Sequence, residues 1–170
     1  PGPPRPTSAW DDRRVTTHHH LDATVDSAVD VFTAERQPVL TVEPGDTVTV
    51  RTLSAAGYTE RQAGPGLDAP TLTDPRRGHC LVGPIAVAGA RPGMVLAVHF
   101  DDLVPDDWGY TASGGVDSPV NRALGLTDPA SRGPLLWDID VAARVAVNQL
   151  GLGVRTAPFL GVVGVPPELT

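Results

Sequence analysis

The stretch RGHCLVGPIAVAGARPGMVLAVHFDDL, residues 77–103, decides the fold class of this chain. It contains two apolar runs, 81–88 and 94–100, separated by the tetrapeptide ARPG. Apolar, β-branched runs bounded by Gly and Pro predict strands, and Pro followed by Gly suits the centre of a type II turn. The stretch therefore predicts a β-hairpin that opens on His79 and ends on an acidic pair.

A second stretch, QPVLTVEPGDTVTVRTLS at residues 37–54, has the same organisation. Its two apolar or alternating runs flank the turn EPGD, which predicts either a hairpin or two strands joined at a corner. The segments 54–78 and 103–134 are rich in Gly and Pro and are predicted as long loops. Further strands are predicted at 15–22, 135–141, 143–147 and 159–165, the last as a buried glycine-rich strand.

These elements together predict an all-β fold, a sandwich or barrel with long Gly/Pro-rich loops. Residues 1–14 are predicted to form an extended arm, because proline does not fit the interior of a helix or sheet. Residues 15–170 are predicted to form one β-rich domain. The chain has 170 residues, 41% hydrophobic and 5% aromatic, so its core is expected to consist mainly of Val, Leu and Ala.

Composition excludes several classes of protein. A net charge of −7 argues against a nucleic-acid-binding surface. The absence of lysine excludes Schiff-base chemistry and a P-loop lysine within these residues. A single cysteine excludes an internal disulfide. No apolar run reaches the roughly 18 residues of a transmembrane helix and no signal peptide is visible, so we expect no membrane association and a cytoplasmic location.

Two pairs of residues are candidate metal ligands. Side chains alternate between the faces of a strand, so His18 and His20 point to one side and His19 to the other. Two imidazoles on one face can bind a divalent metal if carboxylates complete the site. Asp138 and Asp140 share a face in the same way and are the candidate carboxylates. The alternatives are solvated histidines on a surface strand and carboxylates that accept backbone N–H groups.

Two further residues are candidates for direct chemistry. His79 precedes a predicted strand, where a side chain can project into a pocket, although a loop histidine without catalytic duty is favoured over that role. Cys80 is next to it, but neighbours in a strand face opposite ways, so a buried cysteine is favoured over a nucleophile. Glu43 is the first residue of the EPGD turn and is a candidate site carboxylate.

The tripeptide Trp108-Gly109-Tyr110 lies within the predicted loop 103–134. Binding residues are often found on loops that a rigid scaffold positions. We therefore predict that these three residues form the wall or lid of a substrate pocket.

Six segments in order resemble the acetamidase/formamidase family, from about residue 17 to the C-terminus. The most specific is GPIAVAGARPG with the alternating run that follows it and the pair Trp108-Gly109. The six segments are HHLDAT, VLTVEPGDTVTVRTLS, GHCLVGPIAVAGARPGMVLAV, DDWGY, LLWDID and PFLGVVGVPP. This resemblance implies a β-rich fold and a metal-dependent hydrolase that converts small amides to a carboxylate and ammonia. Zinc is the metal expected first, with calcium as the alternative.

The resemblance covers only the N-terminal half of the family. Family chains are roughly twice as long, and their second half carries Gly-Gly-Asn-x-Asp and Gly-Asp-x-His elements that these residues do not contain. We therefore expect a second polypeptide to complete the fold and to supply most metal ligands, either as the other half of a cleaved precursor or as a separate subunit. A higher oligomer is also expected. Met94 stands where the family turn usually has an aspartate, and Tyr110 where a tryptophan is common.

Within this half, the resemblance implies catalytic or orienting duty for His20, which matches the family's His-Leu, and for His79, which matches its Gly-His. A metal-bound water would attack the amide carbon while a carboxylate passes a proton to the leaving nitrogen. Two alternatives stay open: a diverged member that does other C–N or acyl chemistry in a biosynthetic pathway, and a non-enzymatic β-module that binds a ligand or protein.

Overall fold

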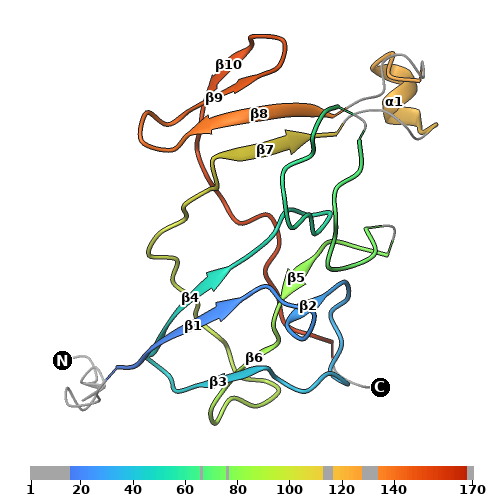
Figure 1. Cartoon of the computed structure of the whole chain (residues 1–170). Helices are drawn as coiled ribbons and strands as arrows, with labels where there is room; N and C mark the ends of the chain where they lie inside the picture. The colour runs from blue at the N-terminus through green and yellow to red at the C-terminus, as the bar shows by residue number, and fades with distance from the viewer. Residues whose placement is uncertain (1–15, 66, 76, 113–116, 128–133, 168–170) are drawn as a thin grey trace, which may run out of the picture.

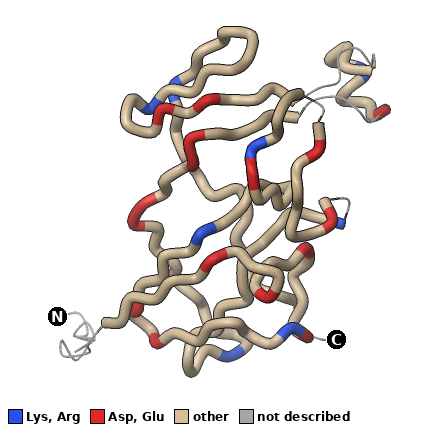
Figure 2. Tube along the Cα trace, in the orientation of Figure 1, with Lys and Arg blue, Asp and Glu red and all other residues tan. Residues whose placement is uncertain are grey.

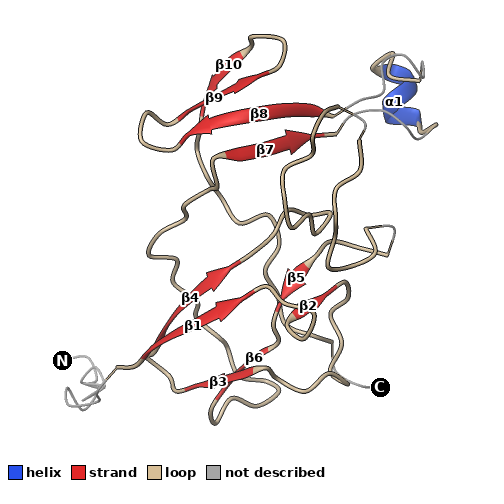
Figure 3. Ribbon diagram, viewed as in Figure 1, coloured by secondary structure: helices blue, strands red, loops and turns tan. Residues whose placement is uncertain are grey.

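The structure is a computed structural model that describes residues 16–65, 67–75, 77–112, 117–127 and 134–167. The predicted N-terminal arm, residues 1–14, lies outside this range. The described residues form ten strands and one short helix (Figures 1 and 3), so the prediction of an all-β fold is confirmed. The strands form four separate sheets, and no closed barrel is present among them.

Three of the four sheets are two-stranded ribbons, and each joins segments far apart in the sequence (Figure 1). β1 (His18–Asp22) pairs in parallel with β4 (Thr47–Arg51). The other two ribbons are β2 (Ala28–Val29) with β5 (Leu81–Val82), antiparallel, and β3 (Leu40–Val42) with β6 (Ile85–Val87), parallel. Because β3 and β4 belong to different ribbons, the EPGD turn between them is a corner and not a hairpin.

The hairpin predicted for residues 77–103 is wrong. The first run supplies β5 and β6, which pair with β2 and β3 rather than with the second run. The second run, 94–100, is assigned to no strand, and all of its residues are exposed. The local turn did form, since Met94 N–H donates to the Arg91 carbonyl at 3.1 Å. The prediction failed because distant segments, and not the neighbour across the turn, satisfy the backbone of the first run.

The fourth sheet is antiparallel with the order β10-β9-β8-β7. β8 (Leu135–Asp140) and β9 (Val145–Asn148) confirm the strands predicted there, while β10 (Gly153–Arg155) was not predicted. The loop prediction for 103–134 is wrong in two places, at β7 (Trp108–Thr111) and at α1 (Pro119–Ala123). Ser118 caps α1 by accepting a hydrogen bond from Asn121 N–H, and Pro119 follows it at the first helical position, both common signals of a helix start.

The predicted loop 54–78 is compactly folded. Leu72 N–H donates to the Gly57 carbonyl, and Cys80 N–H donates to the Ala55 carbonyl, so both ends of the loop are fastened to each other. Gln62 is buried inside it and donates to the Leu67 carbonyl at 2.8 Å. These contacts make the loop a fixed part of the scaffold and not a solvated connection.

The core of the described residues is small. Its buried apolar members are Ala28, Val42, Cys80, Leu136 and Ala146. By contrast, residues 159–165 are exposed throughout, so the prediction of a buried strand there is wrong for this structure. Among the described residues, no helix has the length and apolar character that crossing a bilayer requires.

Candidate functional site

The β1–β4 ribbon carries the histidine cluster. His18 and His20 point to the same side, and their rings stack with centroids 4.7 Å apart and planes 8° from parallel. His18 Nε2 hydrogen-bonds Thr49 Oγ1 on the neighbouring strand at 2.7 Å. Both imidazoles are exposed. The predicted alternation along β1 is therefore confirmed, and it presents two imidazoles side by side on an open face.

His19 lies on the other side of β1 and contacts Asp46, the last residue of the EPGD turn. The Asp46 carboxylate accepts hydrogen bonds from Thr17 N–H at 2.9 Å, His19 Nε2 at 2.8 Å and Glu43 N–H at 3.0 Å. The Thr17 N–H contributes most, followed by His19, and together these donors lower the pKa of Asp46 to about 2. The carboxylate is 7% exposed and fastens the start of β1 to the corner between β3 and β4. The sequence predicted the EPGD turn, but not this three-donor arrangement around its last residue.

The three predicted catalytic residues are not brought together. His20 lies on β1, Glu43 lies in the β3–β4 corner, and His79 lies just before β5; all three are exposed. No hydrogen bond or ion pair between described residues joins any two of their side chains. Cys80 is 8% exposed while its neighbour His79 faces solvent, as the alternation argument predicted.

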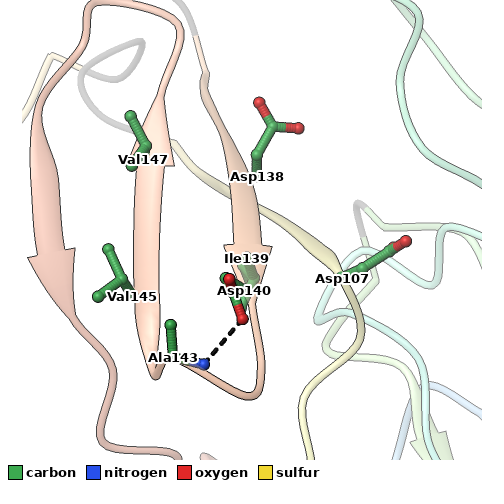
Figure 4. A pocket seen from close by; sticks show the side chains of 7 residues that line it. All are labelled: Asp107, Asp138, Ile139, Asp140, Ala143, Val145 and Val147. Atoms are coloured by element: carbon green, nitrogen blue, oxygen red, sulfur yellow. Dashed lines mark hydrogen bonds between the residues drawn. The ribbon is translucent and has the colours of Figure 1, made fainter.

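The second candidate region is a hollow of about 580 Å³ on the sheet β7–β8–β9. Its lining combines the carboxylates of Asp107, Asp138 and Asp140 with the apolar side chains of β9 (Figure 4). The three carboxylates do not converge on one point, since in Figure 4 they aim in different directions. The hollow is therefore an open apolar surface with an acidic edge, and not a closed binding site.

Both predicted metal carboxylates already have partners. Arg61 donates to Asp138 at 2.5 Å, and Asp140 accepts Ala143 N–H at 2.8 Å, which closes the β8–β9 turn. They lie in a different sheet from His18 and His20. Within the described parts of the chain, no three or more Cys, His, Asp or Glu residues are grouped as a metal would require. The two predicted pairs of metal ligands are thus not joined into one site.

The tripeptide Trp108-Gly109-Tyr110 is part of strand β7, paired with β8, and not a loop lid. Its residues do not line the hollow. The Tyr110 ring instead meets Tyr58 from the folded loop 54–78, edge to face, with centroids 5.3 Å apart. Burial raises the pKa of the Tyr58 phenol, and Tyr110 acts in the same direction.

Sequence reasoning missed this junction between the loop and the sheet. Its members Tyr58 and Arg61 carry no motif, and the only signal was the length of the Gly- and Pro-rich segment around them. Loops of that length without secondary structure are uncommon in compact domains. The junction fixes the loop against β7 and β8 through an aromatic contact and an ion pair.

Chemically, the described residues offer ligands and surfaces but not a reaction centre. Exposed imidazoles can bind a cation or carry a proton, and the hollow can hold apolar groups. The pair His18 Nε2 and Thr49 Oγ1, 2.7 Å apart, joins an imidazole to a hydroxyl as covalent catalysis needs, but both residues lie exposed on the open face of the ribbon.

Comparison with known proteins gives a family and a fold. Residues 17–170 match the model of the acetamidase/formamidase family. No curated protein matches the chain significantly. Among solved structures, the chain is similar to an acetamidase from Bacillus halodurans, with 24% sequence identity and a TM-score of 0.61. The match covers 87% of this chain and 46% of that acetamidase, so the chain spans less than half the length of this relative.

Proposed function

The chain belongs to the acetamidase/formamidase family, and on that premise we propose that it forms part of an enzyme that hydrolyses small amides to a carboxylate and ammonia. The observation that carries the proposal is the family match, which extends over residues 17–170. The likeness to the Bacillus halodurans acetamidase supports it at the level of the fold.

We further propose that this chain supplies only part of the active site. In support, the candidate catalytic residues His20, Glu43 and His79 lie on three different segments and share no hydrogen bond or ion pair in the described residues, and the chain spans less than half of the acetamidase that it resembles. A second polypeptide, either the other half of a cleaved precursor or a separate subunit, would contribute the remaining groups. A higher oligomer of such units is part of the same proposal.

The described residues do not by themselves fit a metal site. His18 and His20 offer two imidazoles, and Asp138 and Asp140 are held elsewhere by other partners. We therefore derive no catalytic step through a metal. Zinc, or calcium as the alternative, remains a proposal about the complete enzyme, with most ligands supplied by the second polypeptide.

Within the complete enzyme, we assign the exposed face of β1 to the active site. The imidazole of His20 can take a proton from water and return it to a leaving nitrogen, which is the usual role of a histidine in general acid–base catalysis. The hydrogen bond from His18 to Thr49 fixes the orientation of the His18 ring. The His20 ring stacks on this fixed ring, which in turn orients His20. Trp108, Gly109 and Tyr110 contribute the strand edge on which a pocket wall is built.

The test is ammonia release by protein purified under native conditions from its complete gene. Acetamide and formamide are the first substrates, and an imide and an ester of similar size are the comparison compounds. Release of ammonia from a simple amide supports the proposal. Turnover of the imide or the ester alone would favour a diverged member with other C–N or acyl chemistry. No turnover of any of them by the metal-supplemented protein would contradict an enzymatic role.

A further inference from the structure

Two apolar segments of the chain are exposed in the part that the structure describes, although the Phe32 ring lies against Gly164 of the second segment. The first is residues 94–100, MVLAVHF, and the second is residues 159–165, FLGVVGV. Every residue in both segments is exposed. Val95 is 95% exposed and Phe159 is 82% exposed, whereas large apolar side chains of this kind are normally among the most buried in a folded protein.

The backbones of the two segments are also unpaired. No backbone hydrogen bond joins residues 95–100 or 159–165 to any other residue that the structure describes. An extended apolar segment with free N–H and C=O groups is a template for another strand. At the two ends of the first segment, Met94 N–H donates to the Arg91 carbonyl within the turn, and the His99 side chain hydrogen-bonds the Asp101 side chain.

The sequence of both segments is that of strands buried on two faces. A strand with one solvated face alternates apolar and polar residues, whereas a strand covered on both faces is a continuous apolar run. Residues 94–98 and 159–165 contain no polar side chain. In Figure 2 the corresponding stretches of the trace are tan, without acidic or basic residues. If one face of each strand were in water, every second residue of the run would be expected to be polar.

The total solvent-accessible surface of the chain also indicates that part of it is covered in the complete protein. The chain exposes 12961 Å², whereas a self-contained protein of 17.7 kDa exposes about 7,900 Å². If the 30 undescribed residues are counted as fully exposed, at about 150 Å² each, the 140 described residues keep about 8,500 Å², roughly 1,500 Å² more than the ~6,900 Å² of a self-contained protein of their size. An obligate interface buries about 1,000 to 2,500 Å² on each partner. The excess therefore has the size of an obligate interface.

We propose that residues 94–100 and 159–165 are the docking strands for the C-terminal half of an acetamidase-type chain, which adds strands beside them and covers both of their faces. This inference rests on the proposed function, because that function requires a second half. The occupant is indicated by the Bacillus halodurans acetamidase, more than half of which lies outside the match to this chain. A polypeptide of that size has the surface needed to cover two separate segments.

Photo-crosslinking tests the docking directly. Benzoylphenylalanine is introduced at Val95 or Phe159 in protein purified from its complete gene, with Val25, which is apolar and 75% exposed elsewhere, as the matched control. The expected products join positions 95 and 159 to peptides that follow residue 170 or belong to a second subunit. Position 25 is expected to give at most a tenth of that yield. Crosslinks to residues 1–170 of another copy, or none from either position, would overturn the proposal.

A substitution provides a second readout that does not depend on crosslinking chemistry. Val95→Asp and Val163→Asp place a charge in each segment, and Val25→Asp places the same charge at the control position. In the native protein, docking should slow amide hydrogen exchange in both segments. In each of the first two variants, the exchange rate of the substituted segment is expected to rise at least tenfold, whereas Val25→Asp should leave the exchange rates of both segments unchanged. Equal exchange in all three variants would contradict the docking. Because neither readout requires turnover, a docked but inactive protein would count against the amidase proposal alone.

Discussion

The folded loop 54–78 makes a quantitative prediction about Gly57. This residue has φ +76°, and a Cβ at its position would lie 3.0 Å from Thr73 Oγ1 and 3.2 Å from Cys80 Cβ. A left-handed backbone costs a non-glycine residue about 1 kcal/mol, and forcing a methyl group into a packed site costs about 1–3 kcal/mol. Gly57→Ala is therefore expected to lower the free energy of unfolding by about 2–4 kcal/mol.

Gly151→Ala is the matched control. Gly151 has φ +79°, but no atom lies within 4 Å of the position that its Cβ would take. The control should therefore lose only the backbone term, about 1 kcal/mol. The gain from a less flexible unfolded chain is the same for both substitutions and cancels in the comparison. The difference of about 1–3 kcal/mol isolates the packing of the loop against Thr73 and Cys80.

Urea denaturation of the native protein measures the difference through the shift in midpoint, since the free energy of unfolding falls linearly with denaturant. Labelling of Cys80, the single cysteine, supplies a local readout. Because its thiol is buried beside Gly57, it should react slowly in the native protein and faster in Gly57→Ala than in Gly151→Ala. Equal midpoints for the two variants, or rapid labelling of the unaltered protein, would refute the packed loop.

Three further outcomes are expected. Asp46 has a pKa of about 2 in the folded state against an ordinary value of 3.8, so its stabilising contribution is complete above about pH 4 and is lost as the pH falls toward 2. Acid titration followed by circular dichroism should show this loss of stability. In Asp46→Asn, the dependence of stability on pH over this range should be weaker. Arg61 and Asp138 are both well exposed, so a double-mutant cycle on the two should give a coupling below about 1 kcal/mol, and a much larger value would mean that the pair is buried in the complete protein. His20→Asn should lower kcat/KM for a simple amide by about 10²- to 10⁴-fold, whereas Arg155→Gln, at an exposed residue of β10 in another sheet, should leave it unchanged; equal effects would remove His20 from the proposed site.

Local patterns identified which residues form strands better than which strands pair. The alternation in residues 47–51 and the run LLWDID at 135–140, apolar at first and then alternating, were sufficient to place β4 and β8. The hairpin at 77–103 failed because pairing is decided by contacts between distant segments, here β5 with β2 and β6 with β3. The burial predicted for 159–165 failed for a different reason. An apolar run indicates that a segment is more stable when covered, but it does not show whether the residues that would cover it are part of the same sequence.

The candidate site was predictable only in its local parts. Alternation along β1 correctly grouped His18 with His20 and separated His19. Whether carboxylates from β8 join those imidazoles depends on how two sheets are arranged, which no spacing within the sequence encodes. The structure keeps these groups in different sheets and gives Asp138 and Asp140 other partners.

We propose above that these residues are one part of a larger amide hydrolase. Native mass spectrometry of protein purified from its complete gene is the decisive test. We expect particles that contain this sequence together with the rest of an acetamidase-type polypeptide, either in one chain or as a second species in equal amount. Particles whose masses are multiples of 17.7 kDa alone, containing no further polypeptide, would contradict it.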